Sequence, residues 1–475
     1  MSARLADRRV LLAAIVLLAT GVRLAGIGDR LSDAEGYSWL VAAAPDAGSF
    51  FDRLADYENT PPLFYALLAL TPLDDEAWLR LPALVPALAS IAVLYCVVRP
   101  TLGTRIALLA ALGLAVAPYH VSYSNYSRGF MLAGLGLLLA TWGVARLIEG
   151  RRRRWWWLYL GGAVLALHAE YYSVLFLCPL LLALALSRRR PAVEVALLAV
   201  VPLLTLLPLV GEIARGLDAL DETKFAPTFA QPTPGKLRDT VVALAAGEHG
   251  TASGDLLRWG QLAAIAAALA ASAWWLARRS LRLRATGDRS PDAAIALLIG
   301  VPAATLALHA IVAVAGPDLF DQRYLSGLIP LAAALIAYGV SALPSRLATA
   351  GAVAAAVGLA AAIGLQRSGR ELEPDYVALA RAVRSAGARP VLTNSAVVYY
   401  YLRDREPLLD RPFGRGPGTE VSCLERCHRP YAVVEDSRQG EGARAGPGAV
   451  SWYGPISVRV VRRGAEGTAE AFIRS

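Results

Sequence analysis

The sequence predicts an all-α polytopic membrane protein that carries a small C-terminal α/β domain. Of its 475 residues, 56% are hydrophobic and only 18% are charged, which is too apolar for a soluble domain that buries one face of each element. Apolar runs long enough to cross about 30 Å of hydrocarbon recur along residues 1–366 and alternate with short arginine clusters. Residues 367–475 have the composition of a soluble domain.

The apolar runs predict about eleven membrane spans. The first follows Arg4, Arg8 and Arg9 and is read as an uncleaved span. The expected spans are Val10–Ile27, Arg80–Val98, Arg105–Pro118, Arg128–Ile148, Trp155–His168, Tyr172–Leu186, Val193–Val210, Trp259–Ala277, Ala293–Ala315, Tyr324–Leu343 and Leu347–Leu365.

The arginine clusters between these spans set the expected topology. By the positive-inside rule they face the cytoplasm, so the N-terminus is cytoplasmic and an odd number of spans places the C-terminal domain outside. The net charge of +9 is divided among these clusters and forms no continuous face, so we expect no nucleic-acid partner.

The first outward loop, residues 28–79, is acidic in a basic protein. Between Asp29 and Glu76 it has ten acidic residues against two arginines: Asp29, Asp33, Glu35, Asp46, Asp52, Asp56, Glu58, Asp74, Asp75 and Glu76 against Arg30 and Arg53. Its apolar stretch Pro61–Pro72 is too short to cross a membrane, so we expect a helix that lies on or dips into the outer surface.

The C-terminal domain is predicted to be α/β. Asp375–Ser385 has a helical pattern, and strands are expected at Pro390–Thr393, Tyr431–Val434 and Ile456–Val461. Cys423 and Cys427 are candidates for a disulfide in an oxidising compartment, although so short a loop gains little stability from one.

Polar residues gather at the expected outward ends of the spans. There an arginine can pair with the phosphate of a lipid-anchored substrate, and a carboxylate can take the proton of an incoming hydroxyl. Each residue also has an ordinary explanation, because acids cap helices and interfacial arginines and tyrosines anchor spans. The residues are Asp33, Glu35, Tyr119, His120, Tyr123, Asn125, Arg128, His168, Glu170, Tyr171, Tyr172, Asp318, Asp321, Arg323 and Tyr324.

The order and spacing of several polar segments in this chain are similar to those of a known family of membrane enzymes. The chain resembles the polytopic GT-C glycosyltransferases, in particular the bacterial relatives of protein O-mannosyltransferases and of the aminoarabinose transferase that modifies lipid A. The matching segments over about residues 5 to 366 are the acidic loop with Asp33 to Ser38, Asn59-Thr60-Pro61-Pro62-Leu63-Phe64-Tyr65, Leu79-Arg80-Leu81-Pro82, Pro118 to Arg128, and Gln322-Arg323-Tyr324-Leu325 with Pro330.

The resemblance implies transfer of a sugar from a polyprenyl-phosphate donor to a cell-envelope acceptor (glycan, lipid or protein) at the outer membrane face, usually with inversion. It implies that a carboxylate of the first loop, Asp33 or Glu35, is the base and that Arg128 and Arg323 bind the donor phosphate. Further candidate substrate contacts are Asn59, His120, Tyr123, Asn125, Glu170 and Tyr324. Some members use a divalent metal, so Mg or Mn at Asp33 and Glu35 stays open.

Three departures from the family pattern bear on these roles. Ala34 stands where the family has an aspartate, which leaves Asp33 one residue early and keeps both Asp33 and Glu35 as candidate bases. Asn59 replaces a histidine before the double proline, and Tyr126 replaces an acidic residue. Ala169-Glu170-Tyr171 stands for a T-H-Y element, with His168 offset by two.

Two other classes of protein fit part of the pattern. A lipid or sugar permease places its polar groups near the bilayer midplane on broken helices, whereas here they gather at one face and the two halves show no repeat. A non-catalytic relative that serves as an envelope scaffold would bind the donor without turnover, and the Ala34 departure keeps that alternative open.

Overall fold

The structure is a computed structural model that describes most of the first two thirds of the chain and parts of the rest. The described residues are 2–58, 60–151, 153–214, 233, 235, 240, 266, 269–279, 281, 292–315, 323–341, 376–385, 391–393, 396–403, 407–409, 431–436, 450–453 and 456–461. The expected span Leu347–Leu365, residues 259–265, 267 and 268 of the expected span Trp259–Ala277, Asn59, Cys423 and Cys427 lie outside them.

The chain divides into two compact units. Unit 1 comprises residues 1–28 and 59–369, and unit 2 comprises residues 29–58 and 370–475. The division assigns the first half of the acidic loop to the same unit as the C-terminal residues, whereas the sequence analysis grouped the whole loop 28–79 with the membrane domain.

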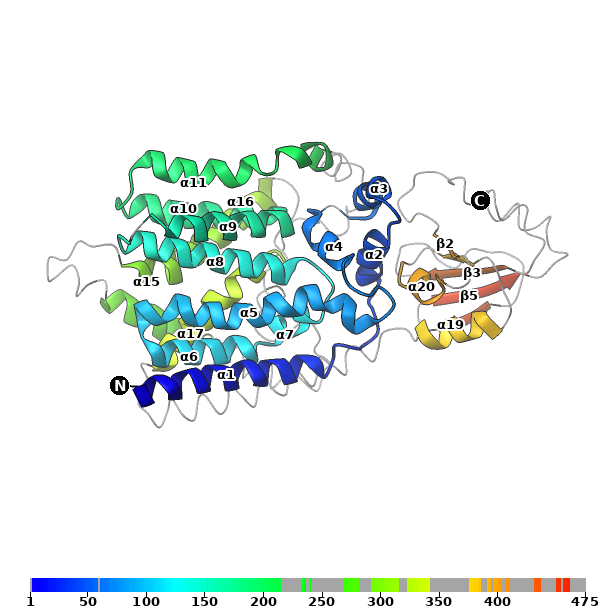
Figure 1. The fold of residues 1–475 in the computed structure, drawn as a ribbon, viewed down its shortest axis with the longest axis horizontal. Coiled ribbons are helices and arrows are strands. Elements are labelled where there is room, and N and C mark those ends of the chain that lie inside the picture. The colour runs from blue at the N-terminus through cyan, green and yellow to red at the C-terminus, as the bar shows by residue number, and fades with distance from the viewer. Residues whose placement is uncertain are drawn as a thin grey trace. The chain divides into compact units, whose positions relative to one another are not determined.

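Unit 1 is a helical bundle (Figure 1). Helix α8 packs against α5, α9 and α10, while α6 packs against α1, α5 and α17. The elements are α1 (Ser2–Leu24), α4 (Leu63–Leu68), α5 (Glu76–Leu102), α6 (Thr104–Ala115), α7 (Pro118–Ser124), α8 (Phe130–Ile148), α9 (Trp155–Ala169), η1 (Tyr171–Ser173), α10 (Val174–Leu186), α11 (Ala192–Leu204), η2 (Leu207–Leu209), α15 (Ala293–Ile295), η4 (Ala296–Gly300), α16 (Val301–Ala315), η5 (Ser326–Leu328) and α17 (Ile329–Ser341).

The expected spans coincide with these helices wherever both are described. Four helical stretches of the described residues are long and apolar enough to cross a membrane: Glu76–Leu102, Phe130–Ile148, Ala192–Ala214 and Ala293–Val314. A fifth candidate is the pair α6 and α7, which bends by 57° at its break. The protein is a multi-pass membrane protein, and α4, with six residues, is far too short to be one of its spans.

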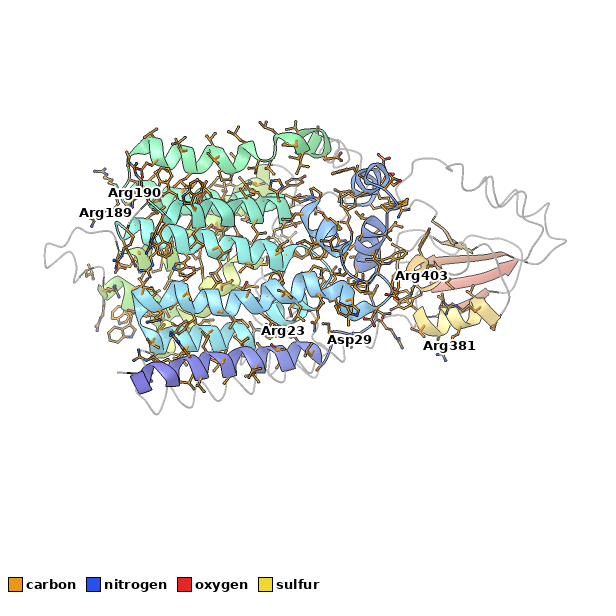
Figure 2. The ribbon with its side chains drawn as sticks, viewed as in Figure 1. Arg23, Asp29, Arg189, Arg190, Arg381 and Arg403 are labelled. Atoms are coloured by element: carbon orange, nitrogen blue, oxygen red, sulfur yellow. The ribbon has the colours of Figure 1, made fainter. Side chains whose placement is uncertain are left out.

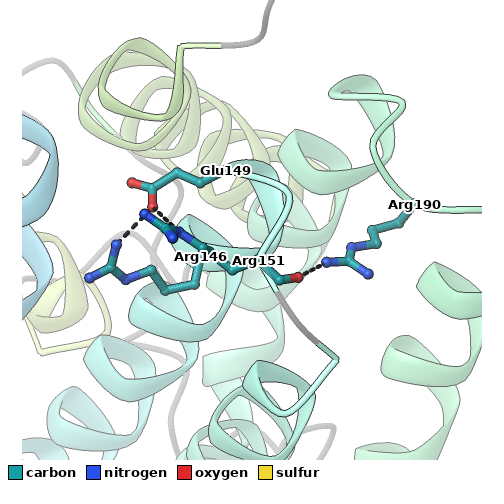
Figure 3. Close-up of polar contacts among 4 residues, drawn as sticks. All are labelled: Arg146, Glu149, Arg151 and Arg190. Atoms are coloured by element: carbon teal, nitrogen blue, oxygen red, sulfur yellow. Dashed lines mark hydrogen bonds and ion pairs between the residues drawn. The ribbon is translucent and has the colours of Figure 1, made fainter.

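One end of the bundle is rich in arginine. Arg146 Nη1 donates to Glu149 Oε2 at 2.8 Å, and Arg151 Nε lies 3.9 Å from the same oxygen. Arg190 Nη2 donates to the backbone carbonyl of Arg151 (Figure 3). Arg189 and Arg190 lie at the opposite end of the bundle from Arg23 (Figure 2). The assignment of the arginine-rich end to the cytoplasmic face stays a prediction of the positive-inside rule.

Unit 2 combines helices from both ends of the chain with a sheet. Its elements are α2 (Asp33–Ala42), α3 (Ala47–Tyr57), α19 (Tyr376–Ser385), β1 (Val391–Thr393), α20 (Ala396–Tyr401), β2 (Pro407–Leu409), β3 (Tyr431–Asp436), β4 (Val450–Tyr453) and β5 (Ile456–Val461). The strand order is β2-β1-β3-β5-β4, with β1 parallel to both its neighbours and β5 antiparallel to both of its own.

Local sequence accounts for the start and the buried face of these helices. The Asp46 carboxylate caps α3 by accepting from the Ser49 amide at 2.8 Å, and this hydrogen bond lowers the pKa of Asp46. Helix α19 buries Tyr376, Leu379, Ala380 and Val383, a spacing that forms one stripe on a helix. The helix and strands expected in the C-terminal residues coincide with α19, β1, β3 and β5.

Candidate functional site

Arg128 lies in the turn between α7 and α8 and is held by the double-proline segment. Its Nη1 donates to the hydroxyl of Tyr65 at 3.2 Å, and that hydroxyl lies 2.8 Å from Thr60 Oγ1. Tyr65 is in α4, where its side chain is buried. Two of the segments singled out in the sequence, residues 59–65 and 118–128, therefore meet at Arg128.

The turn that carries Arg128 is fixed on both sides. Ser127 Oγ donates to the carbonyl of Leu79 at 2.8 Å, which ties the turn to the start of α5. On the other side a Cβ on Gly129 would lie 2.5 Å from the carbonyl oxygen of Ala169, so only glycine allows this approach to the end of α9. The backbone next to Arg128 thus lies against the backbone next to Glu170, whose side chain is buried.

Arg323 and Tyr324 join the same region through aromatic contacts. The guanidinium of Arg323 lies 5.9 Å from the ring centre of Tyr324, and that ring lies 4.3 Å from the ring of Tyr172. Tyr172 belongs to η1, which directly follows Glu170. Four separate segments (60–65, 118–129, 169–173 and 323–326) are thereby linked within unit 1.

His120 and Asn125, expected to contact substrate, both bind Arg23. Arg23 Nη2 lies 2.7 Å from His120 Nδ1, and Asn125 Nδ2 donates to the backbone carbonyl of Arg23 at 2.8 Å. Because a guanidinium has no acceptor, Nδ1 of His120 must be the acceptor. His120 is therefore neutral, with its proton on Nε2.

Sequence reasoning missed Arg23, which lies fully buried in the last turn of α1. Its Nη1 donates to the carbonyls of Ala19 at 3.0 Å and Ala115 at 2.8 Å. Ala115 is the last residue of α6, where the α6–α7 pair breaks and leaves carbonyls without helical donors. The signal in the sequence was a single arginine within the apolar run Val10–Ile27.

Tyr123 is part of an aromatic cluster. Its ring stacks on Tyr119 with centres 4.1 Å apart and meets Tyr126 and Phe130 edge-on at 5.4 Å. Tyr123 is buried. This packing holds α7 against the start of α8, so the described contacts of Tyr123 serve the shape of the turn that presents Arg128.

The two candidate bases lie in unit 2, at the start of α2. Glu35 is buried and its Oε2 accepts from the amide of Ser32 at 2.9 Å and from the hydroxyl of Ser32 at 3.0 Å. This is the acidic half of a capping box, which satisfies a backbone donor ahead of the helix. Asp33 is the first residue of α2, and its side chain lies outside the described part of the structure.

The described side chains do not assemble a metal site. Among them there is no group of three His, Cys, Asp or Glu residues that could hold an ion, and Glu35 Oε2 is occupied by two donors from Ser32. The side chain of Asp33, the other carboxylate proposed for such an ion, lies outside the described residues.

Comparisons with known proteins show what this chain is similar to. Residues 59–211 match the family model described as dolichyl-phosphate-mannose-protein mannosyltransferase. A search of curated protein sequences gave no match.

Solved structures with the same fold extend the likeness over most of the chain. ArnT from Cupriavidus metallidurans in the apo state is similar with a TM-score of 0.63 at 14% identity, covering 96% of this chain and 98% of that one. The same protein bound to undecaprenyl phosphate gives 0.59 at 12% identity, with 95% and 97% covered. The archaeal oligosaccharyltransferase AglB from Archaeoglobus fulgidus, in complex with an inhibitory peptide and a dolichol-phosphate, gives 0.53 at 12% identity, with 90% and 69% covered.

Proposed function

We propose that this chain is a membrane glycosyltransferase of the GT-C superfamily, and that it transfers a sugar from a polyprenyl-phosphate donor to an acceptor hydroxyl at the outer face of the membrane. The family-model match over residues 59–211 and the fold shared with ArnT support the proposal. The acceptor is a cell-envelope glycan, lipid or protein. The observation that carries the proposal is the meeting of three motif segments at Arg128: the double-proline segment, the turn that follows α7 and the end of α9.

Arg128 is the group we assign to the donor phosphate. Tyr65 and Thr60 fix the direction of its side chain, which reduces the entropy lost when the guanidinium binds a phosphate. Arg323 is assigned to the same phosphate, supported by the ring contacts that bring its segment to η1. The structure of ArnT bound to undecaprenyl phosphate supports this class of lipid.

The reaction is proposed to proceed with inversion. The Asp33 carboxylate takes the proton of the acceptor hydroxyl, the oxygen attacks the anomeric carbon from the face opposite the phosphate, and the bond from that carbon to the phosphate oxygen breaks. Polyprenyl phosphate leaves with the bond's electron pair, and the arginines neutralise its charge. Glu35 is assigned to orienting the start of α2, since its carboxylate accepts from Ser32.

The test is release of polyprenyl phosphate by the purified protein, offered a panel of polyprenyl-phosphate sugars with a cell-envelope extract as acceptor source. We expect release with one sugar, and Asp33→Asn should lower turnover about 100-fold or more with donor binding unchanged. Binding of the lipid without release by the parent protein would instead indicate a non-catalytic relative. Movement of the lipid across vesicles without cleavage would indicate a permease.

Donor binding by two arginine variants tests the role of Arg128. Arg128→Gln should weaken donor binding about 10-fold or more, because hydrogen bonds to charged groups contribute about 1.5–3 kcal/mol. Arg189→Gln, at the arginine-rich end of the bundle (Figure 2), is the matched loss of one guanidinium and should leave donor binding unchanged. Equal effects of the two variants would remove Arg128 from the phosphate site.

A further inference from the structure

The start of α2 is packed against α20 so closely that a methyl group does not fit between them. A Cβ on Gly36 would lie 2.4 Å from the amide nitrogen of Val397 and 2.7 Å from the carbonyl carbon of Ala396. Both are backbone atoms and cannot be moved by a change of rotamer. Glycine at position 36 is therefore what allows the two helices of unit 2 to touch.

Contacts on either side of Gly36 extend this interface. The amide of Leu31 donates to the hydroxyl of Tyr401 at 3.2 Å, joining residues 370 positions apart. Beyond Gly36, the ring of Trp39 meets Tyr400 edge-on at 5.2 Å. Asp33 and Glu35 lie between these two contacts in the chain.

Helix α20 is itself held firmly by the C-terminal residues. Ala396, Val397 and Val398 are fully buried. The ring of Tyr401 stacks on Tyr376 of α19 with 6.0 Å between centres, and its carbonyl accepts from Arg384 Nη2 at 2.7 Å. A shift of α20 would break these contacts, so the helix offers α2 a rigid surface.

We propose that α20 positions the catalytic carboxylate, with Gly36 and Tyr401 as the positioning residues. The C-terminal part of the chain then contributes to the chemical step itself, by fixing the first turn of α2. Small displacements of a reacting group are costly, since about 1 Å can reduce a rate on the order of 100-fold. This inference rests on the proposed function, in which Asp33 is the base, because the contacts of Gly36 and Tyr401 would fix the position of that carboxylate.

The test separates turnover from donor binding. Gly36→Ala should lower kcat about 10-fold or more while the KM for the donor stays within about 2-fold, because Arg128 and Tyr65 belong to the other unit. Tyr401→Phe removes only the hydroxyl that accepts from Leu31 and keeps the ring, so it should lower kcat by less than Gly36→Ala does. Gly28→Ala is the matched control, since nothing lies within 4 Å of a Cβ there.

A measurement independent of activity keeps the inference separate from the proposed function. In the full-length protein, amide hydrogen exchange over residues 31–42 should rise in Gly36→Ala and Tyr401→Phe and stay unchanged in Gly28→Ala. If the parent protein releases no polyprenyl phosphate, the proposed function fails while exchange still tests the interface. Wild-type kcat and exchange in both Gly36→Ala and Tyr401→Phe would overturn the positioning role, and Tyr401→Phe decides the matter if Gly36→Ala does not fold.

Discussion

Arg23 shows how a single charged side chain is accommodated within an apolar helix. A buried guanidinium is unfavourable unless its donors are satisfied. Here two carbonyls and one imidazole accept from Nη1 and Nη2, while Nε is buried with no hydrogen-bond partner among the described residues. The same side chain pairs the orphan carbonyl of Ala115 at the break between α6 and α7. The residue thus stabilises the bend that leads to His120, Asn125 and, beyond them, Arg128.

Loss of Arg23 should destabilise the bundle. In Arg23→Met the acceptors at Ala115 and His120 lose their donor, at a cost of about 1–3 kcal/mol for each group left buried and unpaired. We expect a lower thermal midpoint in detergent, with Arg23→Lys intermediate because an ammonium can still donate but lacks the guanidinium fork. A midpoint for Arg23→Met equal to that of the parent would show that the network contributes no net stability.

At the scale of helices, glycines set the distance between α8 and α9. A Cβ on Gly162 would lie 2.5 Å from both the amide nitrogen of Ala140 and the carbonyl oxygen of Gly136. Such small residues allow close backbone approach between membrane helices. Since α8 begins two residues after Arg128 and α9 ends just before Glu170, this packing also fixes how those two segments meet.

Two neighbouring glycines of α9 provide an internal comparison. Gly162→Ala should destabilise the bundle by about 1–3 kcal/mol through overpacking, less the gain of about 1 kcal/mol in helix propensity. Gly161→Ala meets nothing within 4 Å and should be neutral or stabilising by up to about 1 kcal/mol. Thermal unfolding of both variants in one detergent checks the difference, and equal midpoints would contradict it.

At the scale of the whole molecule, the acidic loop is divided between the two compact units. Residues 29–58 form one unit with the C-terminal residues, while the double-proline segment from residue 59 onward belongs to the bundle. We expect α2 and α3 to lose structure when the C-terminal part of unit 2 is destabilised and to keep it when the bundle is destabilised.

Paired aromatic truncations test this grouping. Tyr376→Ala removes a fully buried ring that stacks on Tyr401, a type of change that costs about 3–5 kcal/mol in a core. It should raise amide exchange over residues 33–57 without altering exchange in α8 and α9. Tyr159→Ala removes a buried ring from α9. It should raise amide exchange in α8 and α9 and leave exchange over residues 33–57 unchanged. Exchange over residues 33–57 that follows Tyr159→Ala would assign α2 and α3 to the bundle.

The sequence by itself determined the class of the protein, the positions of its apolar helices and the order of the motif segments. Hydrophobic runs and capping residues act over a few neighbours, so they can be read from local sequence. Only the tertiary structure decided that Arg128 binds Tyr65, 63 positions away, that Arg23 binds His120, and that Leu31 meets Tyr401. Such contacts depend on how distant segments pack, and a charged or aromatic residue looks the same in the sequence whichever partner it has.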